Sequence, residues 1–126
     1  MERLLYVSLG GAAGSAARYL VSLWALERCG PAFPWGTLAV NVVGSLLLGL
    51  VMQLAALVEG FPPTLRLTIT VGMLGGFTTY SSFNHETLVL LAAGRYGPAA
   101  GYAAARHTAS VAAGLAGMAL ARAIAG

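Results

Sequence analysis

Polar residues interrupt the third long apolar segment of the chain at its midpoint. From Gly75 to Asn84 the sequence reads Gly-Gly-Phe-Thr-Thr-Tyr-Ser-Ser-Phe-Asn. Glycine and the β-branched threonine both weaken an α-helix, and broken backbone at membrane depth persists only where protein or a water-filled cavity satisfies the freed groups. Unwound carbonyls are good ligands for a hard cation, and half-helix ends carry dipoles suited to ions. The segment therefore predicts an ion site.

Three more residues could contact an anion. Asn41 lies inside the second apolar segment, where an asparagine either hydrogen-bonds a neighbouring helix or donates its amide to a passing ion. Tyr80 and Phe83 follow the polar run, one helical turn apart. They are either packing residues or rings whose positive edges face a cavity and weakly favour a small anion.

A polar stripe is expected on the fourth segment. Tyr102, Arg106 and Ser110 recur at four-residue intervals, so they share one face of a helix. A phenol, a guanidinium and a hydroxyl in a row either line a path for an anion or form a hydrogen-bond seam between helices. The sequence alone leaves both interpretations open.

The sequence contains no set of residues suited to enzyme catalysis. His85-Glu86 suggests zinc, but no second histidine follows four residues later and no cysteine lies near it. The sequence contains no aspartate, so no Ser-His-Asp set can assemble. We expect a protein that is not an enzyme.

The composition indicates that the elements carrying these residues lie in a bilayer. Of 126 residues, 58% are hydrophobic and 9% are charged, whereas a soluble domain has roughly a quarter charged. Nucleic-acid binding requires clustered basic residues, but the seven arginines fall singly. We expect a multi-pass protein whose surroundings are lipid and which binds no nucleic acid.

Four apolar segments are each long enough to cross about 30 Å of hydrocarbon, which takes about 20 residues. They cover residues 4–26, 36–58, 64–93 and 99–124, separated by short turns rich in glycine and proline. The prediction is an all-α membrane protein with a single domain, 1–126, of four transmembrane helices, the third broken at its centre.

The arginines give no preferred orientation across the membrane. With four crossings, one side holds Arg3, Arg66 and Arg122, and the other holds Arg28, Arg95 and Arg106. Orientation follows the imbalance of positive charge between short loops, and there is none here. The chain is therefore expected to insert both ways and to pair with its own inverted copy about a two-fold axis in the membrane plane.

The first segment is dense in small residues, among them Gly10, Gly11 and Gly14. Glycines at this spacing let two helix backbones approach closely, so packing is the favoured interpretation over any ligand role. Arg18 follows one turn later, and a buried arginine in a membrane helix is costly unless paired. It anchors an interface or attracts anions.

Three motifs resemble the Fluc (CrcB) family of fluoride channels. The family's P-x-G-T-L-x-V-N segment is similar to Pro34-Trp35-Gly36-Thr37-Leu38-Ala39-Val40-Asn41, and its G-G-x-T-T-F-S-T-F signature is similar to the run from Gly75 to Phe83. Its first-helix pattern, G-G-x-x-G-x-x-x-R, matches the residues from Gly10 to Arg18. The resemblance covers essentially the whole chain.

The resemblance implies an antiparallel, dual-topology homodimer in the cytoplasmic membrane that exports fluoride passively and so lowers its toxicity. Two fluoride pores are implied, together with a structural sodium ion at the dimer axis held by the backbone carbonyls of Gly75 and Thr78 from both subunits. The pore residues implied by position are Asn41, Tyr80, Phe83, Tyr102, Arg106 and Ser110, with Glu86 near one entrance. Tyr80 replaces a phenylalanine of the family pattern, and Arg106 replaces a smaller polar residue.

Two other functions are compatible with four short apolar helices. A small dual-topology multidrug exporter needs a carboxylate buried in its first helix for proton exchange, but Glu2 and Glu27 only flank that segment. A packing subunit of a larger membrane complex explains the glycines of the first segment. It leaves the polar break in the third without a purpose.

Overall fold

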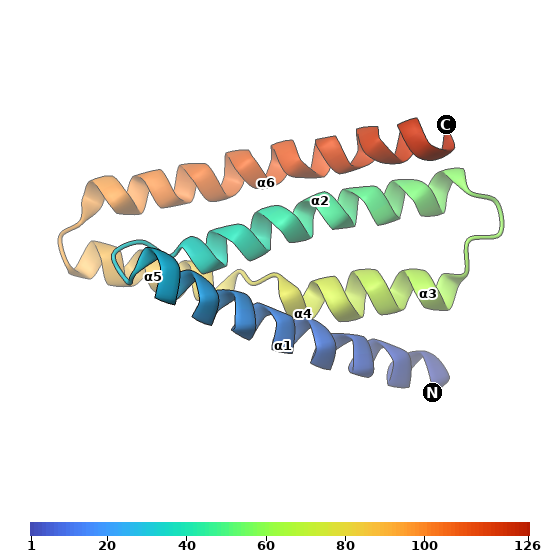
Figure 1. Cartoon of the computed structure of the whole chain (residues 1–126), viewed down its shortest axis with the longest axis horizontal. Helices are drawn as coiled ribbons and strands as arrows, with labels where there is room; N and C mark the ends of the chain where they lie inside the picture. The colour runs from blue at the N-terminus through green and yellow to red at the C-terminus, as the bar shows by residue number, and fades with distance from the viewer.

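The structure is a computed structural model that describes all residues, Met1–Gly126, and every regular element in it is helical. Three long helices are α1 (Glu2–Cys29), α2 (Trp35–Leu57) and α6 (Tyr96–Ala125). The third crossing consists of α3 (Pro63–Leu67), η1 (Thr68–Leu74), α4 (Gly75–Phe77) and α5 (Ser81–Ala92). In Figure 1 the helices extend along the long axis of the molecule, and both termini lie at the same end. The prediction of an all-α protein with four helical crossings is confirmed.

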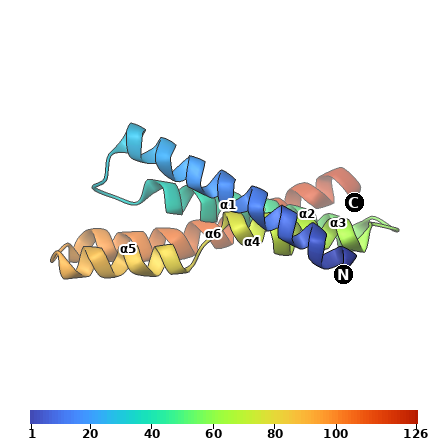
Figure 2. The same ribbon diagram turned by 90° about the horizontal axis from the view of Figure 1, so that it is seen from below.

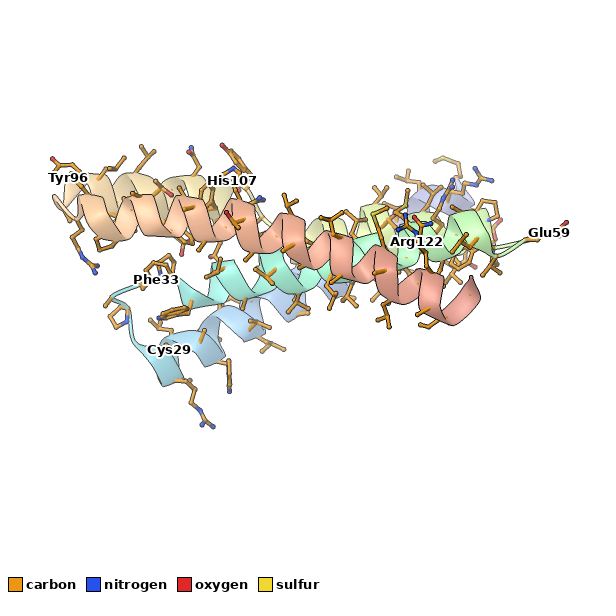
Figure 3. All side chains as sticks on the ribbon, turned by 90° about the horizontal axis from the view of Figure 1, so that it is seen from above. Cys29, Phe33, Glu59, Tyr96, His107 and Arg122 are labelled. Carbon is orange, nitrogen blue, oxygen red and sulfur yellow. The ribbon has the colours of Figure 1, made fainter.

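The surface of the single chain is too apolar for water. Only 17 of the 126 residues are buried, and large apolar side chains such as Leu20, Trp24 and Leu88 are exposed. Helices α2 and α6 are each long and apolar enough to cross a membrane, while α1 and the pieces of the third crossing do not reach that criterion. Residues of the turns and helix ends, among them Glu59, Arg122, Cys29 and Tyr96, gather at the two ends of the rods (Figure 3). This is a membrane protein.

The break in the third crossing lies just after the paired glycines. Gly75 and Gly76 are still helical in α4, and the chain leaves the helix at Thr78, whose backbone is extended (φ −85°, ψ 158°). Helix resumes at Ser81 in α5. The break itself is confirmed, at Thr78–Tyr80 near the middle of the crossing.

A π-helical stretch, η1, precedes the break and was not expected. The hydroxyls of Thr68 and Thr70 donate to the carbonyls of Thr64 and Arg66, each four residues earlier and each at 2.7 Å. Hydroxyls bonded back in this way bend helices, which accounts in part for the wider turn between Thr68 and Leu74.

Glycines bring α1 into backbone contact with η1 and α4. A Cβ atom added to Gly14 would lie 1.9 Å from the carbonyl oxygen of Met73, and one added to Gly10 would lie 2.7 Å from that of Thr68. On the facing segment, a Cβ at Gly76 would lie 2.6 Å from the carbonyl oxygen of Gly11. Figure 2 shows α1 crossing the third segment near α4. The packing interpretation of the first-segment glycines therefore holds.

Helices α2 and α6 run in the same direction and form the largest interface of the bundle (Figure 1). Glycines again set the spacing: a Cβ at Gly49 would lie 2.2 Å from the carbonyl oxygen of Gly114, and one at Gly117 would lie 2.1 Å from that of Leu46. Asn41 and Ser110 are consequently held on facing surfaces of a rigid pair.

Two turns are shorter than the sequence predicts. Helix α1 continues through Glu27 to Cys29, and the chain turns only at Gly30, which has φ 75°. Helix α6 begins at Tyr96 and includes Pro98. Proline is tolerated in the first turn of a helix because the N–H it lacks has no partner there.

Candidate functional site

Asn41 makes hydrogen bonds to the backbone at the break in the third crossing. It is 1% exposed, its Nδ2 donates to the carbonyl oxygen of Thr79, and its Oδ1 accepts from the Thr79 N–H, both at 2.9 Å. The amide thus takes the place of the helical partners that Thr79 lacks. Because an asparagine amide has two N–H groups, one donor of Asn41 remains for another acceptor.

Several carbonyls of the break accept no hydrogen bond. The Thr79 N–H, which would bond Gly75 in a continuous helix, donates to Asn41, and the Ser82 N–H, which would bond Thr78, donates to the Thr79 hydroxyl. No other group of the chain donates to the carbonyl of Gly75 or Thr78. The two residues expected to hold a cation therefore offer free carbonyl oxygens.

The neighbouring carbonyl of Gly76, in contrast, accepts a hydrogen bond from Arg18. Its Nε donates to the carbonyl oxygen of Gly76 at 3.0 Å. Of the two roles left open for this arginine, it performs the anchoring one, joining α1 to the end of α4. A partly buried arginine is thereby paired, as its cost in a membrane requires.

A cavity of about 290 Å³ brings two groups of predicted residues together. Asn41 and Arg106 line one part of it, and Gly75 and Thr78 line another; the remaining lining residues are Gly44, Ser45, Leu48, Thr70 and Leu74. A second cavity of about 360 Å³ shares Ser45 and Leu48 with it and includes Ser110. Asn41 and Arg106 thus line a cavity between α2, α6 and the third crossing, and Ser110 lines an adjoining cavity between α2 and α6.

Aromatic rings form a separate cluster beside these cavities. The ring of Phe83 lies 5.6 Å from that of Tyr80 and 5.0 Å from that of Tyr102, centroid to centroid, and both pairs are tilted. Phe83 and Tyr102 are buried, whereas Tyr80 is 62% exposed. Phe33, from the loop before α2, packs edge-on against Tyr102 at 5.3 Å. Tyrosine 102 therefore lies in packed aromatic surroundings rather than beside Ser110.

Glu86 lies at the border of this cluster. Its Oε1 accepts a hydrogen bond of 3.3 Å from the Tyr102 hydroxyl. Together with Thr37, His85 and Arg95, it lines a further cavity of about 410 Å³ near the turn between α1 and α2. The acidic residue expected near a pore entrance is thus at the mouth of a hollow.

Arg106 and Ser110 carry the only two buried side-chain polar atoms without a hydrogen-bond partner, Nε and Oγ respectively. The Arg106 guanidinium carbon lies 5.9 Å from the ring centroid of Tyr80 and 5.5 Å from that of Phe83, within the range of a cation–π interaction. Buried polar groups are almost always bonded. The exceptions here are both members of the predicted stripe, and both are donors.

Ser45 and Thr79 were missed by the sequence reasoning. Ser45 borders both adjoining cavities, and its position four residues after Asn41 on one helix face was an available signal. Thr79 contributes through its backbone, which no residue type reveals.

Comparison with known proteins gives full-length matches. The family model described as "CrcB-like protein, Camphor Resistance (CrcB)" matches residues 5–118. The fluoride-specific ion channel FluC of Anaeromyxobacter dehalogenans is 54% identical over 126 residues, which is all of both chains. The FluC of Agrobacterium fabrum is 47% identical over 122 residues, covering 97% of this chain and 98% of that one. The FluC of Sorangium cellulosum is 57% identical over 91 residues, 72% of each chain.

Proposed function

This chain belongs to the CrcB family, and on that premise we propose that it is a fluoride-selective ion channel that lets fluoride leave the cytoplasm passively. The relatives named fluoride-specific ion channels are similar to it over its whole length. The structural observation that carries the proposal is the pair of unpartnered buried donors, Arg106 Nε and Ser110 Oγ, beside the cavity of Asn41. The family is one of ion channels, which are not enzymes.

The direction of flow follows from the acid chemistry of fluoride. Hydrogen fluoride is a weak acid that crosses a bilayer as a neutral molecule and ionises in a neutral cytoplasm. The anion cannot return through lipid and accumulates. A passive channel in the cytoplasmic membrane lowers cytoplasmic fluoride because the anion then runs down its own gradient.

Fluoride is strongly hydrated, so a pore must replace its water with donors. The free N–H of Asn41 and the hydroxyl of Ser110 are such donors, whereas the Tyr102 hydroxyl already donates to Glu86. The rings of Tyr80 and Phe83 have positive edges, which offer contacts too weak to trap the ion. Conduction needs binding that is favourable at entry but weak enough for exit.

The conducting unit is proposed to be an antiparallel homodimer. Tyr80 and Gly75 are exposed in the single chain, so one copy leaves its ring and its cation ligand open. A second copy, inverted about an axis near the break, covers both. The exposed apolar side chains of α1 and α5, such as Leu20 and Leu88, face this partner and lipid.

A sodium ion at the axis is the proposed structural partner of the free carbonyls. Gly75 and Thr78 present two carbonyl oxygens without donors, and hard cations bind such unwound backbone. Two copies of the chain together offer four such carbonyl oxygens. When bound, the ion supplies fixed positive charge near the membrane centre, and the residues of this chain hold it without any side-chain carboxylate.

The native Cys29 provides a test of dual topology. It is the single cysteine of the chain and is exposed at the end of α1. A maleimide that cannot cross membranes should label about half of the protein in intact cells if both orientations are equally populated, and all of it after detergent is added. Labelling of nearly all or nearly none in intact cells contradicts an antiparallel dimer.

Efflux from liposomes tests the channel and its residues. Fluoride release by the purified protein, measured with a fluoride electrode in the presence of a potassium ionophore, should be lost in Asn41→Asp and in Phe83→Ile. Asn84→Asp is the matched control, because Asn84 is exposed and lines none of the three cavities. A folded protein without fluoride flux would refute the proposal.

A further inference from the structure

Arg106 differs from the other arginines because it lies inside a helix and its Nε has no hydrogen-bond partner. Five of the seven arginines lie at or near the ends of the rods, and two lie inside helices, Arg18 in α1 and Arg106 in α6. Arg18 is bonded to the Gly76 carbonyl, but Arg106 Nε is buried and unbonded. An ionised group in such a place requires a compensating charge or donor–acceptor contact.

No protein group near Arg106 supplies that negative charge. The lining of its cavity contains no aspartate or glutamate. Glu86 accepts from the Tyr102 hydroxyl and lines a different cavity. The guanidinium lies over the rings of Tyr80 and Phe83, at 5.9 and 5.5 Å, and cation–π contacts compensate only part of the cost of a partly buried charge.

The rings also fix where the guanidinium lies. Stacked over two ring faces, it is held beside the cavity that Asn41 lines, and one turn before Ser110 on the same helix. A cation over the face of a ring satisfies its negative quadrupole and leaves the positive edges to other partners. Arg106, Asn41 and Ser110 therefore bring unused donors to the lining of two adjoining cavities.

We propose that Arg106 forms a saturable anion site inside the conduction path and sets the affinity of the channel for fluoride. This inference rests on the proposed fluoride conduction and adds to it the residue that determines the working concentration. A guanidinium makes charge-assisted hydrogen bonds, about twice as strong as neutral ones. The site holds fluoride at low concentration and releases it slowly, so affinity is gained and maximal rate is lost.

The test measures fluoride efflux from liposomes over a range of fluoride concentrations for the wild type, Arg106→Ser and Arg122→Ser. Arg122 is the matched control, an exposed arginine in the last turn of the same helix. We expect Arg106→Ser to raise the half-saturating fluoride concentration about ten-fold or more and to raise the maximal rate. Arg122→Ser should leave both unchanged.

Direct binding separates this inference from the proposed function. The ¹⁹F line width of fluoride, titrated with the detergent-solubilised protein, should broaden with the wild type and Arg122→Ser and much less with Arg106→Ser. If the wild type binds fluoride through Arg106 but conducts none, the channel proposal fails and the anion site stands. If the wild type conducts and Arg106→Ser has the same half-saturation and line broadening, the inference is overturned.

A second substitution guards against a folding defect. Where Arg106→Ser does not assemble, Arg106→Gln replaces it, because glutamine keeps much of the length and hydrogen-bonding capacity without the charge. A half-saturating concentration in Arg106→Gln equal to that of the wild type likewise overturns the inference. A rise of about ten-fold supports it.

Discussion

Replacing Gly14 by alanine tests the close packing that positions the break. The added Cβ would lie 1.9 Å from the Met73 carbonyl oxygen, 2.8 Å from its carbon and 3.0 Å from the Phe77 N–H nitrogen. All three are backbone atoms, so relief requires α1 and the η1–α4 segment to separate. Forcing an extra carbon into packed structure costs about 1–3 kcal/mol, whereas glycine to alanine in a helix gains at most about 1 kcal/mol.

The expected net effect is a destabilisation of up to about 2 kcal/mol, the larger overpacking cost less the helix-propensity gain. In the detergent-solubilised protein this should lower the apparent Tm by several degrees, followed by the fluorescence of Trp24 and Trp35. Arg18 follows Gly14 by one turn and bonds the Gly76 carbonyl, so fluoride flux should fall with it.

Gly101→Ala is the matched control. Gly101 is helical, and a Cβ added there meets no atom within 4 Å, so this variant should melt at or slightly above the wild type. If Gly14→Ala melts no lower than Gly101→Ala, α1 is not in backbone contact with the third crossing and the reasoning is refuted.

Three further outcomes are expected. Arg18→Gln removes the bond to the Gly76 carbonyl and should lower fluoride flux about ten-fold or more, as loss of a charged hydrogen bond would; Arg28→Gln, at the end of α1, should not, and equal flux in both would refute an anchoring role. Tyr80→Phe should keep flux within about two-fold because the ring edge proposed to contact the anion survives, while Tyr80→Leu should lose it; similar flux in the two variants would show that the ring does not matter. Replacing sodium by N-methylglucamine on both sides should lower the apparent Tm of the protein, since the free carbonyls then lack the proposed ion, and an unchanged Tm would argue against the sodium site.

The helical architecture was predictable because it follows from composition and run length. Apolar segments of about 20 residues with few charges form helices in a bilayer, because their backbone N–H and C=O groups must bond within the segment. The boundaries were harder, because Glu27 and Arg28 are compatible with both a turn and an exposed helix end. The structure continues α1 through them to Cys29, and only Gly30 has the positive φ that stops it.

The break in the third crossing lies within the predicted run from Gly75 to Asn84, but its bounds could not be predicted. Gly75 and Gly76 are weak helix formers, yet both stay helical in α4. At Gly76, α1 packs too closely for any larger residue. The chain opens instead at Thr78, where Asn41 replaces the helical partner of Thr79. That bond joins residues 38 positions apart, a distance that no local pattern encodes.

The polar stripe on α6 illustrates the limit of helical periodicity. Tyr102, Arg106 and Ser110 share a helix face, but Tyr102 packs against Phe33 and Phe83, while Arg106 and Ser110 border cavities. Phe33 comes from a loop whose path depends on the whole bundle. The spacing in the sequence predicts that these side chains share one helix face. It does not predict which of them pack against aromatic rings and which border a cavity.

Selective fluoride efflux is the most direct test of the central claim that this protein conducts fluoride. Liposomes containing only the purified wild-type chain are loaded with equal concentrations of fluoride and chloride, and both ions are followed after a potassium ionophore is added. Rapid loss of fluoride with chloride retained is the predicted result. Retention of both ions, or loss of both at similar rates, by a folded protein would contradict the account.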